Sequence, residues 1–516
     1  MLVIEYQYFP KMISSNKQIK LGAILSYLSI AINIIAGLLY TPWMINSIGR
    51  EDYGLYTLAM SVIGLFLFDF GLGAAVTRFI AKYLSEGKQE KADQCLGLVY
   101  RLYIGLDALL LLVFISIFFF IPQIYQELTP DEIEKFKVIY VIAACYSVIS
   151  FPLIPANGVL TAYEKFVQLK LCDVAHKLIM VGTMSVCLLL GYGLYALVLV
   201  NAFAGVSMIL LKLWCINRYT PQKISWGYWN KSELKEIAGY SGWVTVASLA
   251  QRCIFNIAPS ILGALSGSAA IAILGIAITI EGYTFTFANA LSGMFLPKVS
   301  RIVASDGDVL PLMTKVGRIQ ILVISLVIGG FVCLGKDFIR LWVGDQFSLS
   351  YLCATLIIVP SLFQLPQEIG MQTIIAKNKV KQQAIVFSLM AVVNIIGAIL
   401  LSPKYGAVGL CISICVAYLF RTVCLDYIFV KHLGINIWHF FYDSFIKMTP
   451  ALVLSILAGF GLSRLITTEG WLGLLFDGAC FVIPYIVIMW LIGLNRTEKE
   501  MLLVPVKRLV NRTSKT

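Results

Sequence analysis

The sequence has little charge for its length. Only 13% of its 516 residues are Asp, Glu, Lys or Arg, whereas 59% are hydrophobic. A soluble domain carries about 25% charged residues, so this shortage excludes an ordinary soluble globular protein. The mean hydropathy of +0.85 agrees with that exclusion. The composition instead predicts an integral membrane protein.

Histidine and metal-binding cysteine patterns are also scarce. The chain has three histidines, His176, His432 and His439, and they do not form a cluster. Twelve cysteines occur without CxxC or Cys/His spacing. Cys411 and Cys415 share a predicted helix face, which indicates packing more readily than a metal site. We therefore expect neither a metal site nor a cofactor. H⁺ and Na⁺ are candidates only as ions whose movement is coupled to transport.

Long polar stretches are missing as well. Apolar runs of about 20 residues, enough to cross the hydrocarbon core as a helix, recur from Leu21 almost to the C-terminus. These continuous runs favour about fourteen helices over barrel strands, which alternate polar and apolar residues. The polar lead at 1–20 carries Lys11, Lys17 and Lys20, and the span behind it is too long for a cleavable signal peptide.

Charge is distributed unevenly between alternate connectors. Connectors on the same side of the membrane as the N-terminus hold most of the Lys and Arg, for example Lys377, Lys379 and Lys381. Connectors on the opposite side hold acidic clusters such as Asp131 and Glu132. The positive-inside rule then places both termini in the cytoplasm. The net charge of +12 arises mainly from these basic inner connectors. Nucleic-acid binding is not indicated, because the basic residues are spread over every inner loop.

The sequence contains an internal repeat. The stretch SIGREDYGLYTLAMSVIGL aligns with ALSGSAAIAILGIAITIEG near residue 265, and GYGLYALVLVNA (191–202) aligns with KYGAVGLCISIC (404–415). The offset of about 213 to 220 residues predicts two parallel six-helix repeats around a central cavity, plus a C-terminal helix pair. The expected organisation is a lead at 1–20, lobes at 21–214 and 237–430 joined by a linker at 215–236, two more helices at 431–494 and a basic tail at 495–516.

Three features carry a family resemblance: IGREDYGLY after the first span, LFDFGLGAAVTRFIAKY in the second, and the duplicated six-span unit. With them the sequence resembles the Wzx-type polysaccharide flippases of the multidrug/oligosaccharidyl-lipid/polysaccharide exporter superfamily. The resemblance implies a non-enzymatic transporter in the bacterial plasma (inner) membrane. It implies alternating access that moves undecaprenyl-pyrophosphate-linked oligosaccharide units to the outer leaflet. The products would be O-antigen of lipopolysaccharide, capsule or exopolysaccharide, with membrane lipids and the polysaccharide polymerase machinery as partners.

Two other functions stay open. A cation-coupled multidrug exporter of the same superfamily would share the fold. A membrane polysaccharide polymerase or ligase fits less well, because the longest outer connector, 121–137, is short and offers no acid or histidine constellation.

Arg252 is the first candidate for substrate binding. It lies deep in the seventh predicted span, in SLAQRCIFNIAPS. An arginine at this depth should face a wet cavity or an ion-pair partner, since exposure to lipid costs about 3 kcal/mol. Two interpretations remain: Arg252 binds the pyrophosphate, or it pairs with Glu281 at a similar depth in the eighth span.

Four further basic residues form a candidate inner vestibule for the head group. They are Arg101 in the third span, Arg78 at the inner end of the second, and Lys298 and Arg301 at the matching end of the eighth. Arginine suits phosphate because its planar fork binds two oxygens. Ordinary positive-inside anchoring is the alternative for Arg78, Lys298 and Arg301.

Four carboxylates in or near the spans are candidates for ion coupling: Asp69, Asp107, Glu281 and Glu368. A carboxylate in a desolvated site can load and release a proton or a sodium ion. The alternative for Asp69 is a pair with Arg101 or a hydrogen bond at a helix bend. Near Glu368, the prolines of IIVPSLFQLPQEIG match those of ISFPLIPANG in the first half, and both stretches predict kinked helices.

Overall fold

The computed structural model describes residues 15–66, 72–289, 295–465, 470–496 and 498–500, and the elements within them are helical. The chain forms two compact units, unit 1 (1–272) and unit 2 (273–516). The helices of unit 1 are α1 (Ser15–Ile48), α2 (Arg50–Phe66), α3 (Leu72–Ser85), α4 (Gln89–Ile124), α5 (Pro130–Ser150), α6 (Ala156–Ala162), α7 (Phe166–Leu189), α8 (Leu194–Tyr219), α9 (Lys231–Asn256) and α10 (Ala258–Leu265). Helix α11 (Gly267–Asn289) crosses the boundary.

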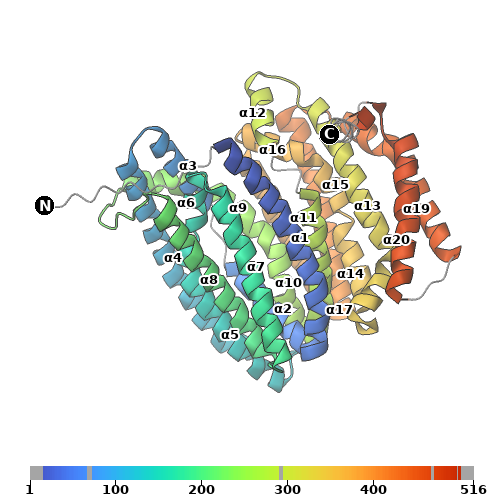
Figure 1. Ribbon diagram of the computed structural model, residues 1–516, viewed down its shortest axis with the longest axis horizontal. Coiled ribbons are helices and arrows are strands. Elements are labelled where there is room, and N and C mark those ends of the chain that lie inside the picture. The colour runs from blue at the N-terminus through green and yellow to red at the C-terminus, as the bar shows by residue number, and fades with distance from the viewer. Residues whose placement is uncertain (1–14, 67–71, 290–294, 466–469, 497, 501–516) are drawn as a thin grey trace, which may run out of the picture. The chain divides into compact units, whose positions relative to one another are not determined.

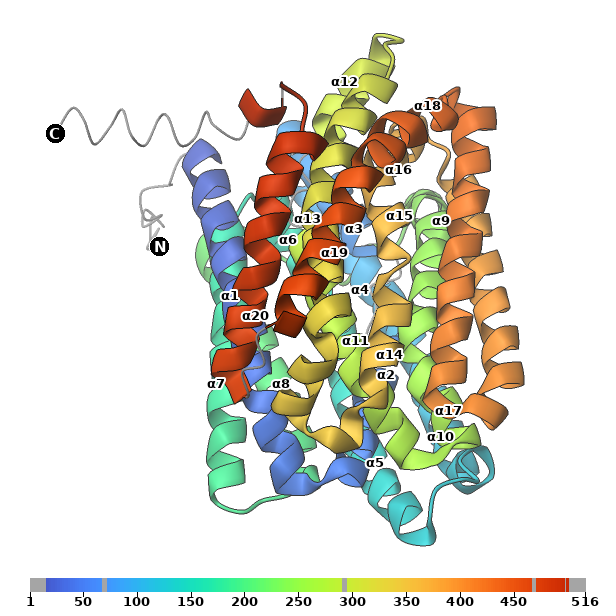
Figure 2. The ribbon, with the colours of Figure 1, turned by 90° about the vertical axis from the view of Figure 1, so that its right-hand side faces the viewer.

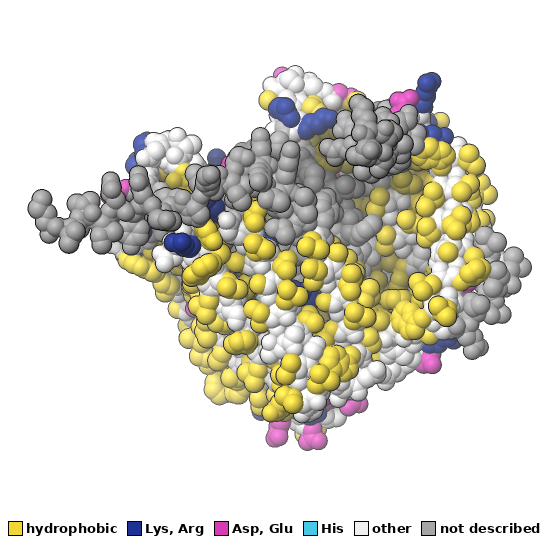
Figure 3. Space-filling view, viewed as in Figure 1, with side chains coloured by type: hydrophobic (Ala, Val, Ile, Leu, Met, Phe, Trp, Pro, Cys, Tyr) yellow, Lys and Arg dark blue, Asp and Glu magenta, His cyan; other side chains and the backbone are white. Residues whose placement is uncertain are grey.

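Unit 1 is a bundle whose long helices run side by side. Helices α4, α5, α7 and α8 pack in neighbouring pairs, α1 lies against α7, and α9 lies against α2 and α3 (Figure 1). Large apolar side chains such as Leu112, Leu178 and Phe203 point outward from these helices. Figure 3 shows hydrophobic side chains covering their sides. Such a surface is stable in lipid and would be costly in water.

The turn between α4 and α5 is set by local chemistry. Thr129 accepts a hydrogen bond from the Glu132 amide, and the Glu132 carboxylate accepts one from the Thr129 amide at 2.8 Å. Pro130 occupies the first helical position, where its missing N–H costs nothing. The sequence TPDE therefore starts α5 at a defined residue.

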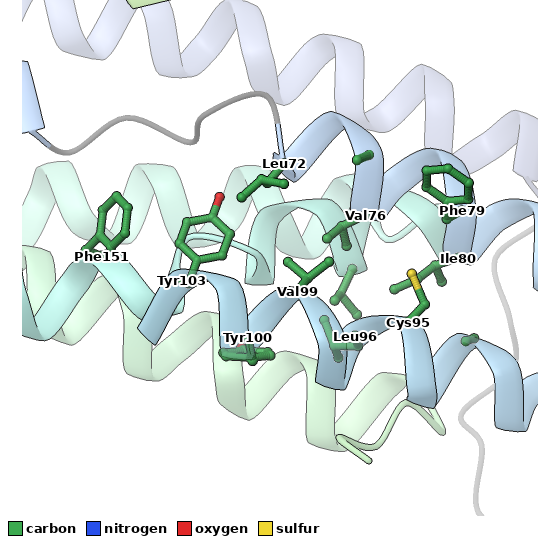
Figure 4. Close-up of a cluster of buried hydrophobic side chains, with 13 residues drawn as sticks. Leu72, Val76, Phe79, Ile80, Cys95, Leu96, Val99, Tyr100, Tyr103 and Phe151 are labelled. Atoms are coloured by element: carbon green, nitrogen blue, oxygen red, sulfur yellow. The ribbon is translucent and has the colours of Figure 1, made fainter. Parts of the chain in front are cut away.

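The α3–α4 pair contains a continuous apolar core. Leu72, Val76 and Ile80 on α3 face Leu96 and Val99 on α4 (Figure 4). Further along, the ring of Tyr103 meets Phe151, with 5.1 Å between ring centroids. This core holds α3 against α4, so it also fixes the direction in which the opposite face of α3 points.

The described part of unit 2 contains the rest of α11 and nine further α-helices: α12 (Leu296–Ala304), α13 (Leu310–Val343), α14 (Leu349–Ile358), α15 (Ser361–Gln364), α16 (Glu368–Ala376), α17 (Val380–Leu433), α18 (Ile437–Phe441), α19 (Lys447–Leu465) and α20 (Gly470–Ile488). It also has π-helical turns at Tyr442–Ile446 and Met489–Gly493. Helix α17 reverses direction at Gly406, whose φ is 54°. The Ser413 hydroxyl donates to the Asn394 carbonyl at 2.7 Å, so the two halves of α17 form a hairpin.

The C-terminal helices α19 and α20 pack against each other and against α13 (Figure 2). Arg318 on α13 holds the start of α19 and the end of α20 together. It donates to the Asp443 carbonyl at 2.6 Å and to the Gly493 carbonyl at 2.7 Å, and it forms an ion pair with Glu498. Asp443 and Gly493 lie in the two π-helical turns, where the wider winding shifts the backbone hydrogen bonds.

Both predicted proline breaks are present. In unit 1, α5 ends at Ser150, a 3₁₀ turn covers Phe151–Leu153, and α6 follows Pro155. In unit 2, α14 ends at Ile358, and α15 and a 3₁₀ turn at Leu365–Gln367 precede α16. The prediction of kinks at corresponding places in the two halves is confirmed.

Among the described residues, eleven helices are long and apolar enough to cross a membrane. Helix α17 supplies two of the expected spans. Helices α2 and α3 together match the second expected span, and α9 matches the seventh. The observed helices are therefore consistent with about fourteen spans. The all-α polytopic fold is thus confirmed. The two compact units divide at 272/273, whereas the predicted lobes 21–214 and 237–430 divide within 215–236. These lobe limits stay a prediction.

Candidate functional site

Unit 1 contains a cavity of about 530 Å³ with both polar and apolar lining residues, here called the unit 1 cavity. That volume falls within the range of about 300 to 1,000 Å³ that is usual for small-molecule sites. Helices α3, α5, α6, α8 and α9 contribute to its wall. Its polar lining consists of Thr77, Tyr146, Ser150, Asn157, Thr161, Lys212, Ser248 and Arg252.

The proline break after α5 shapes one side of the cavity. It brings Gly158 of α6 so close to α3 that a Cβ there would lie 2.7 Å from the Gly73 carbonyl oxygen. The Thr77 hydroxyl donates to both Gly73 and Gly158, at 3.0 and 3.2 Å. Two helices that approach this closely need glycine at the crossing point. Asn157 and Thr161, on the same short helix, line the cavity.

Tyr146 forms another part of the wall by lying over a glycine. A Cβ at Gly205 on α8 would overlap the Tyr146 hydroxyl and the adjoining ring carbon atoms. The missing side chain at Gly205 thus leaves room for the phenol against α8. The width of the cavity at this point depends on that arrangement.

Two cations reach the unit 1 cavity. Arg252 has an exposed side chain, and its Nη1 donates to the Gly64 carbonyl on α2 at 2.7 Å. Lys212 is buried, and its ammonium lies 3.2 Å from the Asp173 carboxylate. Among the described residues that line the cavity, none is Asp or Glu. The lining therefore favours a ligand with negative charge and many hydrogen-bonding groups.

A family model described as "Polysaccharide biosynthesis protein" matches residues 19–303, more than half of the chain. The chain belongs to the polysaccharide biosynthesis protein family. This membership confirms the resemblance to the Wzx-type polysaccharide flippases. The chain is a multi-pass membrane protein.

Relatives and solved structures agree with this family. The chain is 21% identical over 493 residues to "Uncharacterized membrane protein EpsK" of Bacillus subtilis (strain 168), covering 90% of this chain and 93% of that one. The lipid II flippase MurJ in an inward closed conformation matches with a TM-score of 0.69 at 14% identity, over 91% of this chain and 98% of that chain. An inward-facing multidrug resistance MATE family transporter matches with a TM-score of 0.63 at 14% identity, over 78% and 97%. These two likenesses establish the fold.

None of the predicted vestibule residues is among the described residues that line the unit 1 cavity. Arg101 donates to the Tyr228 carbonyl at 3.3 Å and lies over the Trp229 ring, so it holds the linker between α8 and α9. Arg78 is exposed on α3 beside the Phe79 ring. Lys298 and Arg301 are exposed on α12 of unit 2. Their part in receiving a head group stays a prediction.

The linker at Arg101 is also bound through Asp93. The Asp93 carboxylate accepts hydrogen bonds from the Gln222 side chain at 2.7 Å and the Lys223 amide at 2.9 Å. Trp226 packs on Tyr100 with 6.0 Å between ring centroids. The linker therefore has a fixed course along the N-terminal part of α4, and Arg101 helps to hold it there.

The acidic candidates lie in different surroundings. Asp69 lies outside the described residues. Asp107 is half-buried on α4, and its buried Oδ1 has no hydrogen-bond partner among the described residues. Glu368 begins α16 and accepts a hydrogen bond from Gln372 at 2.6 Å. Glu281 belongs to unit 2 and Arg252 to unit 1, so the proposed ion pair between them stays a prediction.

The fold brings inside several polar side chains that the sequence pattern did not single out. Lys212 and Asn157 were absent from the candidates because they lie near connectors, where a polar residue is ordinary. Arg421 was also missed, although AYLFRTVCLDY interrupts an apolar span with two charges. That interruption was the available signal. Arg421 is only 2% exposed in unit 2.

Proposed function

We propose that this protein flips an undecaprenyl-pyrophosphate-linked oligosaccharide from the inner to the outer leaflet of a bacterial plasma membrane. Such a substrate would serve O-antigen, capsule or exopolysaccharide synthesis. Family membership supports transport of a polysaccharide precursor. The observation that carries the proposal is Arg252, an arginine of α9 that lines the unit 1 cavity, where none of the described lining residues is a carboxylate.

The phosphates present the main energetic barrier to flipping. Moving an isolated carboxylate-sized ion from water to a medium of low dielectric costs on the order of 20 kcal/mol before relaxation. A guanidinium that reaches a hydrated cavity reduces this cost by pairing with phosphate oxygens. In our proposal Arg252 supplies this charge.

The sugar part needs many hydrogen-bond partners, because each hydroxyl that leaves water loses its own. The Ser150 and Thr161 hydroxyls and the Asn157 amide line the same cavity as Arg252. Hydroxyl and amide groups can both donate and accept hydrogen bonds, so they suit a sugar of any configuration. This lining favours a glycan head group over an apolar cationic drug.

The first test replaces Arg252. In proteoliposomes holding a fluorescent undecaprenyl-pyrophosphate oligosaccharide, a membrane-impermeant quencher reports the lipid that reaches the other leaflet. We expect Arg252→Ala to slow flipping by about 10- to 100-fold, the effect of losing one charge-assisted hydrogen-bonding partner. Arg252→Lys should retain part of the rate, because it keeps the charge and loses the fork.

Arg340→Ala is the matched control for this test. Arg340 is an exposed arginine on α13 that pairs with Asp337 at 3.2 Å, far along the chain from the unit 1 cavity residues. The Arg340→Ala variant should flip substrate at the normal rate. Normal flipping by Arg252→Ala at equal protein levels would contradict the role of Arg252.

The MATE-like fold keeps a cation-coupled drug exporter as the second candidate. A cationic dye in the same vesicles distinguishes the two functions. We expect no dye transport above protein-free vesicles. Dye transport without flipping of the lipid-linked sugar would favour the exporter instead.

A further inference from the structure

An ion pair borders the unit 1 cavity where α7 and α8 run side by side (Figure 1). The Lys212 ammonium on α8 lies 3.2 Å from Oδ1 of Asp173 on α7. Lys212 is seven residues before the end of α8 and Asp173 is seven residues after the start of α7, which is about 10 Å along each helix. The lysine side chain is only 6% exposed, yet it also lines the cavity. The ammonium is therefore held by a carboxylate at the edge of an open volume.

Apolar packing already joins the two helices at this level. The sulfur atoms of Cys172 and Cys215 lie 3.9 Å apart, and both belong to a buried cluster that includes Leu160. A buried ion pair adds little stability compared with apolar residues of similar volume, because both charges lose their water. The contact between α7 and α8 thus does not depend on the pair of Lys212 and Asp173. This leaves the pair free to act toward the cavity.

Asp173 has a second partner at its other oxygen. Its Oδ2 lies 3.3 Å from the ammonium of Lys170, about one turn closer to the start of α7. The side chains of Lys170 and Asp173 are 35% and 32% exposed, so water reaches both. The carboxylate would therefore keep a counter-ion and hydration if Lys212 moved away. Lys212 could gain a new anion only from a ligand, because no acidic residue is among the described residues that line the cavity.

We propose that Lys212 is a second phosphate-binding residue, and that Asp173 takes the place of a phosphate on it while no substrate is bound. When the pyrophosphate enters, the ammonium exchanges Oδ1 of Asp173 for a phosphate oxygen, and Asp173 stays with Lys170. The exchange reverses when the substrate leaves. This inference rests on the proposed function, because it extends the binding of the same head group from Arg252 to Lys212.

The exchange makes the site sensitive to the number of charges on the head group. A sugar joined to its lipid through one phosphate carries a single negative charge, whereas a pyrophosphate linkage carries two. Arg252 neutralises the singly charged head group, which then has no charge left to draw Lys212 away from Asp173. The doubly charged head group engages both cations. Asp173 is thus a positioning residue that sets the charge a ligand needs in order to free Lys212.

The first measurement tests the exchange without requiring transport. Purified full-length protein is titrated calorimetrically with a short-chain polyprenyl-pyrophosphate oligosaccharide and with its monophosphate counterpart, which carries the same sugar. We expect the pyrophosphate probe to bind about tenfold more tightly, the effect of one further charge-assisted contact. Lys212→Met/Asp173→Asn removes both charges together and should bring this ratio close to one through weaker binding of the pyrophosphate probe. An unchanged ratio in this double variant would overturn the proposal.

The single variant Asp173→Asn gives an effect of opposite sign. It removes the competing anion and leaves Lys212 available to any phosphate, so we expect the monophosphate probe to bind several-fold more tightly than it does to the wild type. A merely structural pair would give no such gain. Weaker or equal binding of the monophosphate probe by folded Asp173→Asn would contradict the exchange. If Asp173→Asn does not fold, the charge-neutral double variant decides the question, with its Tm as the test of folding.

The matched control is Arg340→Met/Asp337→Asn. This exposed pair in unit 2 has the same separation of 3.2 Å, and neither of its residues lines the unit 1 cavity. It should leave the binding ratio unchanged. In proteoliposomes, Lys212→Met/Asp173→Asn should flip the pyrophosphate-linked lipid about tenfold more slowly. If the wild type flips neither lipid, the proposed function fails, while the ratio of binding affinities still decides whether Lys212 and Asp173 exchange.

Discussion

Single residues determine how wide and how charged the unit 1 cavity is. Gly158 permits the close approach of α3 and α6, and Gly205 provides the space that Tyr146 occupies. Arg252 and Lys212 bring positive charge to the wall, but Lys212 is compensated by Asp173. Arg252 is therefore the residue whose replacement should most directly change the affinity for an anionic head group.

Gly205→Ala should narrow the cavity. The added methyl group would displace the Tyr146 ring from α8, and the end of a tyrosine side chain can swing aside at modest cost. We expect slower flipping of the lipid-linked oligosaccharide with little loss of thermal stability, measured in the proteoliposome assay and by Tm. Gly205→Ala/Tyr146→Ala should restore the rate. Failure of this double variant to recover any flipping would show that Tyr146 is not the obstacle.

At the scale of helices, buried polar contacts hold long elements in place. Arg318 bonds a carbonyl from each π-helical turn and pairs with Glu498, so one side chain attaches the C-terminal helix pair to α13. Arg101 and Asp93 attach the 220–230 linker to α4 in the same manner. Apolar packing alone gives little preference between helices in lipid, which is why such polar contacts matter.

Arg318→Met should loosen α19 and α20. This substitution removes the cation and leaves Glu498 buried at 3% exposure without a partner charge. We therefore expect the free energy of unfolding to fall by about 3 to 5 kcal/mol. Thermal unfolding and limited proteolysis near residue 495 measure this effect. Arg318→Met/Glu498→Met should be more stable than the single variant, since no buried charge remains. If the single variant unfolds and is cleaved like the wild type, Arg318 does not hold these helices.

At the scale of the whole chain, charge distribution predicts the orientation in the membrane. The basic connectors and the acidic ones alternate along the sequence. The described helices are compatible with about fourteen spans, an even number that keeps both termini on one side. The described turn after α7 at Gly191 then faces outward.

Reporter fusions test this topology. A phosphatase that is active only outside the cytoplasm should be inactive when fused after residue 516 and active when fused at Tyr192. A fluorescent protein that matures only in the cytoplasm should give the opposite pattern. The physical reason is the excess of Lys and Arg in the inner connectors. Phosphatase activity at the C-terminus would mean an odd number of spans or an inverted chain.

Much of the fold could be predicted from sequence because it depends on local rules. A segment in lipid must satisfy its backbone hydrogen bonds internally, so apolar runs of sufficient length became helices. Prolines broke α5 and α14 where ISFPLIPANG and IIVPSLFQLPQEIG predicted it. The candidate site was less accessible to this reasoning. Arg252 was found from its depth and does line a cavity, whereas Arg101 was expected in a vestibule and binds the linker.

The sequence by itself determined the membrane-spanning helices, the breaks within them and the family, because length, hydropathy and proline act locally. Only the tertiary structure decided which side chains face a cavity, a linker or a buried counter-ion. Successive residues on a helix point about 100° apart, so depth along a span does not fix direction around it. That direction depends on the neighbouring helices, which is why the burial of Arg421 emerged only once α17 was packed against its neighbours.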